Sequence, residues 1–424
     1  MGPYAIWRNQ SYCCYACGWF LMAFAKQVET VAVGIYLYAR TGQALALGWL
    51  GLVQALPMLL LALPGGQLAD RTNRKWVVMA TLAISALVSL GLIGVTTRSL
   101  HVGWVYLLLG LGAVSQALGT PSRSAMLPQI VSAEMFGNAV AWGTTVFQIA
   151  AMTGPAIGGF ILGAENNAVA AFSLVLACRL LSLAAVAGIH NPSGRQRHES
   201  VFLDGLGAGI RFVWKTKLIL ATITLDMFAV LLGGATYLLP IFAEDILQVG
   251  ALGLGLLRSA EAVGAVCMAM LIAHLPPMRH AGRTLLWAVA GFGAATIVFG
   301  LSRWFWLSLA MMFLIGALDN VSVVVRHTLV QMLTPDSLRG RVSAINAMFI
   351  VASNDLGGLE SGVTAWLVGP MLSVVGGGIG TIVVVLAAAR IWPEILTIGS
   401  LRDIRPLAAA DVQRQADEEL TSRL

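Results

Sequence analysis

Charged residues are scarce in this chain. Of its 424 residues only 11% are Asp, Glu, Lys or Arg, whereas 58% are hydrophobic, and the mean hydropathy is +0.81. A water-soluble domain of this length needs far more polar surface. Apolar runs of about 18 residues or more recur instead, each long enough to cross a hydrocarbon layer. The short alternating segments of a membrane β-barrel do not occur. The composition predicts an all-α protein that crosses a membrane many times.

Signatures of catalysis and metal binding are also missing. The sequence has no H-E-x-x-H, no G-x-S-x-G and no nucleotide-binding P-loop, so neither an enzyme nor an ATP-driven pump is predicted. The five cysteines lie in apolar runs. Cys14 and Cys17 form a C-x-x-C with no accompanying His or second Cys pair, which favours apolar filler over metal or redox chemistry. We therefore expect no cofactor and no metal.

Twelve apolar segments are expected to span the membrane. They lie near 11–39, 44–65, 76–97, 102–122, 138–163, 168–189, 218–242, 250–275, 284–301, 304–326, 341–367 and 370–393. Nineteen of the 26 Lys and Arg residues fall at the termini or in connectors after even-numbered spans, and the opposite side has three. Basic connectors stay in the cytoplasm. Both termini are thus predicted to be cytoplasmic and the protein to lie in the inner (plasma) membrane. The net charge of +6 is explained by these basic residues on the cytoplasmic side of the membrane, so it does not indicate a nucleic-acid partner, and none is expected.

The chain divides near its middle and repeats itself. The longest connector, 190–217, begins with polar, helix-breaking residues, and 201–215 has the pattern of a basic amphipathic helix on the membrane surface. Residues 44–50 (ALALGWL) match 251–257 (ALGLGLL) at an offset of 207, and 131–134 match 333–336 at an offset of 202. The repeat predicts two six-helix bundles, 1–189 and 218–395, and a cytoplasmic tail, 396–424. A solute site is expected between the bundles near the membrane midplane.

A charged stretch follows the second span. With twelve spans in two halves, it resembles the G-x-L-a-D-R-x-G-R-[RK] motif of the major facilitator superfamily, here Gly66, Leu68, Asp70, Arg71, Arg74 and Lys75. Asn73 replaces the usual Gly, and Asn tolerates a left-handed backbone. The resemblance implies that Asp70 lies near Gly340 and Arg341 at the start of span eleven and latches the halves together when the transporter opens outward. The basic residues can also bind anionic lipid headgroups, and a purely topogenic role is the alternative.

Span five contains Gly154-Pro155-Ala156-Ile157-Gly158-Gly159. This stretch resembles the G-P-x-x-G-G motif of exporters and antiporters in the same superfamily. Small residues allow close helix approach and Pro bends a helix, so Gly154, Pro155, Gly158 and Gly159 are expected to form a hinge or seal; ordinary helix packing is the other interpretation. Across residues 8–395 the chain resembles the branch of this superfamily that includes the bacterial enterobactin exporter.

Charges inside the spans each require a partner or a role, because a charge at mid-bilayer costs about 2.5–3.5 kcal/mol on insertion scales. Lys26 and Glu29, and likewise Arg258 and Glu261, are three residues apart and are expected to form ion pairs. Arg179 is expected to reach a carboxylate on another helix or to hold an anionic substrate. Three cations face six carboxylates, which predicts an acid-rich chamber. We expect a proton-coupling site among five of the carboxylates: Asp226, Glu261, Asp319, Asp355 and Glu360.

Uncharged polar residues complete the predicted site. Asn346, Ser353 and Glu360 recur at steps of seven in span eleven with Asn354 beside them, and we expect this stripe to line an aqueous cavity. Gln27, Gln54 and Asn320 are further candidates. The sequence thus predicts a monomeric exporter of a small amphipathic molecule, either a drug or a siderophore-like compound, that works by alternating access and is driven by protons. Its partners are that substrate, protons and membrane lipids. The alternative is an uncoupled facilitator or an importer.

Overall fold

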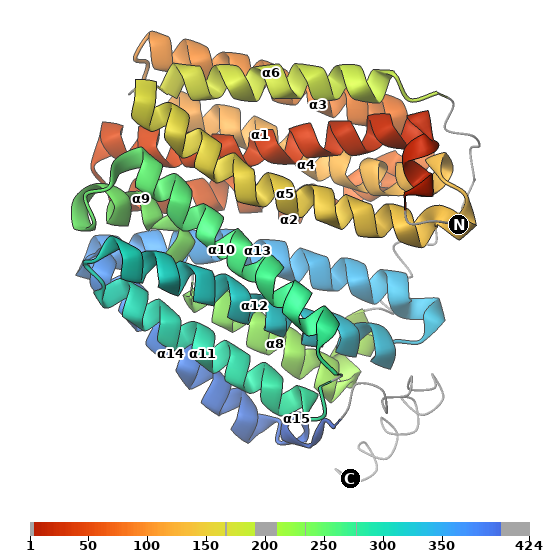
Figure 1. Ribbon diagram of the computed structural model, residues 1–424, viewed down its shortest axis with the longest axis vertical. Coiled ribbons are helices and arrows are strands. Elements are labelled where there is room, and N and C mark those ends of the chain that lie inside the picture. Colours follow the sequence, from red (N-terminus) through yellow and green to blue (C-terminus); the bar gives the residue numbers. More distant parts are fainter. Residues whose placement is uncertain (1–3, 166–167, 191–209, 234, 277, 400–424) are drawn as a thin grey trace.

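The computed structural model describes residues 4–165, 168–190, 210–233, 235–276 and 278–399 (Figure 1). The tail from 400 onward and most of the expected amphipathic segment, 201–209, lie outside these ranges. Residues 210–215 are helical. Phe212 and Val213 are buried against the C-terminal half, in a cluster that includes Leu333. This end of the linker therefore packs onto protein.

The N-terminal half is built from six long helices. They are α1 (Gln10–Thr41), α2 (Ala44–Arg71), α3 (Arg74–Thr97), α4 (Gly103–Ile130), α5 (Ala133–Glu165) and α6 (Ala168–Ala187), preceded by the short η1 (Ala5–Arg8). Each contains a predicted span. Helices α2 and α4 continue well past the predicted ends at 65 and 122, although each contains two prolines. The charged stretch after span two is consequently helical as far as Arg71, and the connector is only Thr72 and Asn73.

The C-terminal half repeats this plan with one interruption. Its elements are α8 (Lys217–Leu232), η2 (Ala235–Tyr237), α9 (Leu239–Ile241), η3 (Phe242–Ile246), α10 (Gly250–His274), α11 (Ala281–Leu301), α12 (Phe305–Leu333), α13 (Asp336–Val368), α14 (Pro370–Ile391) and α15 (Glu394–Thr397). The prediction of one continuous span over 218–242 was wrong. Helix α8 ends at Leu232, and Pro240 lies in the first turn of the short α9, where its missing N–H costs no helical hydrogen bond.

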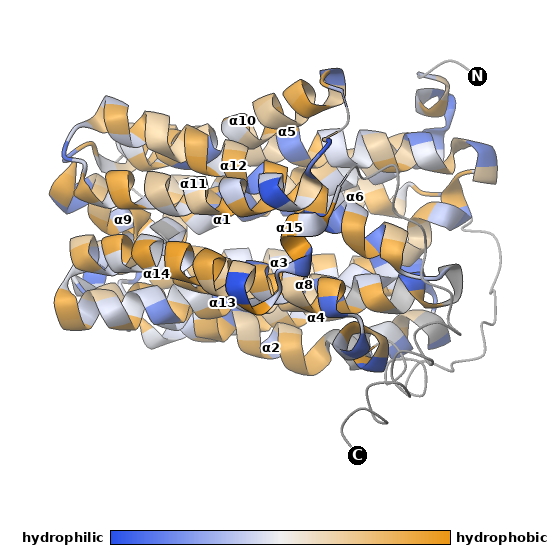
Figure 2. Ribbon diagram, turned by 90° about the horizontal axis from the view of Figure 1, so that it is seen from below, coloured by the Kyte–Doolittle hydropathy of each residue, from blue (hydrophilic) through white to orange (hydrophobic). Residues whose placement is uncertain are grey.

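The all-α membrane fold is confirmed. In the described ranges no strand occurs, and ten helices are long and apolar enough to cross a bilayer. Helix α8, with 16 residues, and the more polar α13 take the places of predicted spans seven and eleven. Large apolar side chains such as Leu60, Leu107 and Leu386 are exposed on the outside, and Figure 2 shows hydrophobic residues along the lengths of the helices. Such a surface suits contact with lipid rather than water.

Two helix pairs connect the halves: α2 packs on α13, and α5 packs on α10. At one end of these pairs the apolar core is continuous, because Leu37 and Leu47 of the N-terminal half share a cluster with Leu239 and Leu254 of the C-terminal half. We call this the closed end; it contains the connectors at 42–43 and 247–249, beside α9 in Figure 1.

The opposite end is packed differently. Two buried clusters there belong to the N-terminal half, around Tyr12 and around Met126. Two others belong to the C-terminal half, around Leu285 and around Leu333. None of these four clusters of described residues contains members of both halves. The halves are thus joined through one shared core at the closed end and have separate cores at the other.

Candidate functional site

A cavity opens inside the N-terminal half. It holds about 910 Å³ of empty space, counted out to where it meets solvent, and its walls come from α1, α3, α4, α5 and α6. Of the predicted site residues, Lys26, Gln27, Glu29 and Arg179 line it. The expectation of a site between the two halves is not met by this cavity, because every lining residue belongs to the N-terminal half.

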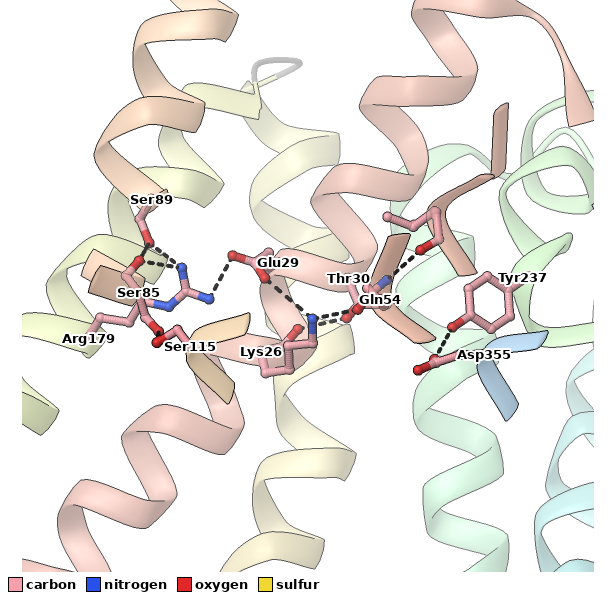
Figure 3. Close-up of polar contacts among 11 residues, drawn as sticks. Lys26, Glu29, Thr30, Gln54, Ser85, Ser89, Ser115, Arg179, Tyr237 and Asp355 are labelled. Carbon is pink, nitrogen blue, oxygen red and sulfur yellow. Dashed lines mark hydrogen bonds and ion pairs between the residues drawn. The ribbon is translucent and has the colours of Figure 1, made fainter. Parts of the chain in front are cut away.

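Three charged residues meet on one wall of this cavity. Lys26 Nζ lies 3.6 Å from Glu29 Oε1, and Arg179 Nη2 lies 2.7 Å from Glu29 Oε2 (Figure 3). The predicted Lys26–Glu29 pair is therefore confirmed, and Arg179 of α6 does reach a carboxylate on another helix. Glu29 and Arg179 have only 4% and 8% of their side-chain surface exposed, whereas Lys26 has 36%. Lys26 is the member of this network that remains open to the cavity.

Serines of α3 hold Arg179 in place. Arg179 Nη1 donates to the Ser85 carbonyl at 2.8 Å and lies 2.6 Å from the Ser89 hydroxyl. Ser115 of α4 donates to the Thr81 carbonyl at 2.7 Å. Sequence reasoning missed these residues. Ser85 and Ser89 are four apart and so share a helix face, and this spacing was the only available signal.

Each half contains a basic residue that stands at or next to the predicted end of a span and lies inside a longer helix. Arg123 belongs to α4, and its guanidinium carbon lies 3.9 Å from the centre of the Trp19 ring. Arg326 belongs to α12, where it is 4% exposed and forms an ion pair with Asp226 of α8. Both lie inside helices because α4 and α12 each extend seven or more residues past the predicted ends at 122 and 326. Asp226 is buried together with Arg326.

The polar network extends to the contact between the halves. Lys26 Nζ donates to Gln54 Oε1 of α2 at 2.8 Å. On the facing side, the Tyr237 hydroxyl donates to Asp355 Oδ1 of α13 at 2.7 Å (Figure 3). Helices α2 and α13 approach closely here, since a methyl group added to Gly51 would lie 3.1 Å from the Leu359 nitrogen. The structure thereby places Lys26 and Gln54 near Asp355, across the junction of the two halves.

The second predicted ion pair does not form. No ion pair between Arg258 and Glu261 occurs in the part of the chain that the structure describes; instead Arg258 Nη2 donates to the Thr236 carbonyl at 3.1 Å. The interruption after α8 leaves carbonyls without helical donors, and a guanidinium can satisfy them. Asp319 lies in a small apolar pocket of about 240 Å³ with Asp226, and the side-chain oxygen of Asn320 is buried without a hydrogen bond.

The predicted polar stripe of α13 does not line the cavity. Asn346 and Ser353 are 6% and 2% exposed, and the Ser353 hydroxyl donates to the Ile350 carbonyl of its own helix. Asn354 is exposed and also donates to Ile350, while Glu360 is half-buried beside Ser361. This cavity is not acid-rich, because its walls contain three cations, Lys26, Arg123 and Arg179, and one carboxylate, Glu29; the predicted acid-rich chamber stays a prediction.

The motif after α2 makes its described contacts within the N-terminal half. Arg74 Nη1 donates to the Ala125 carbonyl of α4 at 3.0 Å, and Lys75 Nζ donates to the carbonyls of Ala187 and Ile189 at 2.7 and 2.8 Å. Lys75 thus neutralises the negative end of α6. Asn73 has a φ of −71° and caps α3 by accepting from the Lys75 N–H, so the expected left-handed turn was wrong.

The other positions of this motif provide less information about its role. Gly66 is half-buried within α2, and Arg71 is exposed in its last turn. The side chains of Asp70 and Arg341 lie outside the described residues, so the predicted latch between Asp70 and the start of α13 stays a prediction.

The glycine motif of α5 contacts both halves. A methyl group added to Gly154 would lie 2.6 Å from Gln27 Cβ of α1, and one on Gly158 would lie 3.3 Å from Val28 Cα. On the other face, a methyl group on Gly159 would lie 2.5 Å from the Ala251 carbonyl oxygen and 2.9 Å from Gly255 Cα, both on α10. The Pro155 carbonyl also touches Gly255. The close contacts of α5 with α1 and with α10 both depend on these positions being glycine, which has no side chain.

Comparison with known proteins identifies the family. The model of the family described as "Transmembrane secretion effector", a branch of the major facilitator superfamily, matches residues 3–410. This chain belongs to that family. It is therefore a multi-pass membrane transporter and not an enzyme.

Among curated proteins, the chain is similar to the enterobactin exporter EntS of Shigella boydii serotype 18 and of Escherichia coli. Each is 26% identical over 328 residues, which cover 76% of this chain and 77% of the relative.

Solved structures confirm the major facilitator fold. A bacterial homologue of the lysosomal transporter Spinster, in an inward-facing and unoccupied conformation, has a TM-score of 0.71 at 13% identity and covers 92% of this chain and 99% of its own. A D-xylose–proton symporter has a TM-score of 0.70 at 14% identity, with coverage of 92% and 99%. At such low identity the likeness extends to the fold alone.

Proposed function

We propose that this transporter is a secondary active exporter of a small amphipathic molecule, either siderophore-like or drug-like, that works by alternating access and is driven by proton entry. We place it in the inner membrane as a monomer, with both termini in the cytoplasm. The main support for this proposal is the asymmetric packing of the two ends. One apolar core joins the halves at the closed end, and each half has its own separate core at the other end. Such a molecule can exchange one closed end for the other by rocking its halves.

The direction of transport is supported by orientation and by relatives. The excess of Lys and Arg assigns the end with separate cores to the cytoplasm. In this state the cavity would receive a solute from the cell interior. The G-P-x-x-G-G stretch, which we interpret as an exporter motif, forms part of the seal at the closed end through Gly159. The curated relatives named above are exporters by their own names.

Proton coupling is proposed to act through Glu29. This carboxylate neutralises Lys26 and Arg179 together, at 3.6 and 2.7 Å. A proton on Glu29 would weaken both pairs and free Lys26, which also bonds to Gln54 near the junction of the halves. One proton would thereby change the contacts of the cavity wall and of the α2 face toward α13. Asp355, across that junction, is a second candidate.

Transport into everted vesicles with an imposed pH gradient tests this proposal. Inside-out membranes with the wild-type chain should accumulate a substrate when their lumen is acidic, and a protonophore should abolish the uptake. The Glu29→Gln variant should lose proton-driven accumulation but keep counterflow of substrate, because a neutral side chain cannot exchange a proton. Accumulation by Glu29→Gln equal to wild type would overturn the role of Glu29. Accumulation that ignores the protonophore would overturn coupling.

An uncoupled facilitator or importer is the second candidate. The observation that favours it is that both carboxylate oxygens of Glu29 already have cationic partners, Lys26 and Arg179. Under this alternative, substrate would move only down its own gradient, and an imposed pH gradient would not raise accumulation in wild type. Comparing wild-type vesicles with and without the pH gradient distinguishes the two functions.

A further inference from the structure

The charges on the cavity wall do not balance. Lys26, Arg123 and Arg179 contribute three positive groups, and Glu29 contributes one negative group. Inside a membrane protein an unbalanced charge is expensive and usually marks the path or site of a charged solute.

The three cations differ in how many hydrogen-bond and ion-pair partners they have within the protein. Arg179 is held by Glu29, by the Ser85 carbonyl and by the Ser89 hydroxyl, and it is almost fully buried. Lys26 has a 2.8 Å bond to Gln54, a longer contact with Glu29 and 36% of its side chain exposed. Arg123 lies against the Trp19 ring and the Met22 sulfur. In the described ranges no carboxylate lies within ion-pair distance of Arg123. Arg123 and Lys26 are the cations left available.

These two cations stand at opposite ends of one wall. Trp19, which carries Arg123 on its ring, and Lys26 are seven residues apart on α1, so they share a face and are separated by about 10 Å along the helix. Phe147 of α5 stacks on Trp19 with ring centres 5.9 Å apart and an angle of 19° between the planes. Gly112 and Gly119 of α4 also line the cavity. An aromatic surface thus lies beside a charged one.

We infer that this cavity binds an organic anion, whose acidic group is held by Arg123, with Lys26 adding positive charge along the same cavity, and whose apolar body lies against Trp19 and Phe147. The inference rests on the proposed export function and narrows its substrate to anionic amphipathic molecules. A guanidinium on an aromatic face still has free N–H groups at its edge for a carboxylate or phenolate. A cationic or neutral compound would leave the positive excess uncompensated. The cavity would therefore bind anionic molecules in preference to neutral or cationic molecules of similar shape.

Equilibrium dialysis tests this inference without transport. The full chain is placed in lipid nanodiscs and binding of 2-naphthoate is compared with binding of 2-naphthamide, a neutral molecule of almost the same shape. Empty nanodiscs give the partition background. Wild type should bind the naphthoate at least about tenfold more tightly, an effect of ordinary size for a charge-assisted hydrogen bond. Equal affinities for the two compounds would overturn the inference.

Substitutions test whether the preference for naphthoate arises at Arg123 and Lys26. Arg123→Gln should reduce the preference to about threefold or less, and Arg123→Lys should retain most of it, because Lys keeps the charge. The control is Arg303→Gln, an exposed arginine on the connector between α11 and α12, which should behave as wild type. If Arg123→Gln does not fold, Lys26→Gln decides instead. A preference that survives in Arg123→Gln or Lys26→Gln, or that Arg303→Gln also removes, would contradict the site.

The two proposals can fail separately. Anion-selective binding with no transport of any tested compound would overturn export and leave the site intact. Proton-driven transport of neutral and anionic compounds with equal efficiency would overturn the site and leave export intact.

Discussion

Replacing Gly159 with alanine should open the closed end. The added methyl group would lie 2.5 Å from the Ala251 carbonyl oxygen and 2.9 Å from Gly255 Cα. Both are backbone atoms of α10, so no side chain can rotate away, and the halves must separate to make room. Overpacking of this kind costs about 1–3 kcal/mol. If opening relieves that cost, the ratio of open to closed molecules should rise by about 5- to 150-fold.

Gly163→Ala is the matched control. Gly163 lies four residues later on the same face of α5, and its added methyl group would lie 3.6 Å from Leu252 Cβ, an ordinary contact. Both substitutions place alanine inside a helix, which favours the helix by up to about 1 kcal/mol. That gain is common to the two variants, so the difference between them reports the contact with α10.

Pulsed electron spin resonance can measure the outcome. Spin labels at Gln43 and Arg303, exposed connector residues of the two halves at the closed end, are introduced after the five native cysteines have been replaced. Gly159→Ala should add a population with a longer distance, and Gly163→Ala should match the parent. Identical distance distributions in both variants would refute the reasoning that Gly159 is required for closure.

Three further predictions concern the ion pairs and the closed end. Asp226→Asn should destabilise the protein by about 3–5 kcal/mol, because it leaves buried Arg326 without its carboxylate; thermal unfolding measures this, and an unchanged midpoint would contradict it. Tyr38→Phe removes a hydrogen bond to Asp245 that joins α1 to η3 across the halves, and should weaken closure by about 0.5–1.5 kcal/mol in the spin-label assay. Burial, and secondly Asp245, raise the pKa of Glu244 in η3. The closed end should therefore be most stable below the ordinary pKa of a glutamate and lose stability as pH rises through the raised value; Glu244→Gln should abolish this dependence.

Local patterns predicted one part of the candidate site. The i, i+3 spacing of Lys26 and Glu29 predicted their pair, since a helix brings such residues together wherever it lies. The same rule failed for Arg258 and Glu261, because the interruption after α8 offered Arg258 a free carbonyl at Thr236. The helix ends near Arg123 and Arg326 were predicted too early for a different reason. Helix ends depend on packing as well as composition, and both α4 and α12 continue beyond their apolar windows.

The sequence by itself determined that this chain is an all-α membrane protein in two related halves, because bilayer thickness and the lack of water force long apolar helices whatever their neighbours are. Only the tertiary structure decided which charges meet. Arg179 finds Glu29 and Ser89, Arg326 finds Asp226, and Gly159 finds α10, through contacts between helices far apart in the chain. No local periodicity encodes such contacts, since they depend on how the helices are rotated and offset against one another.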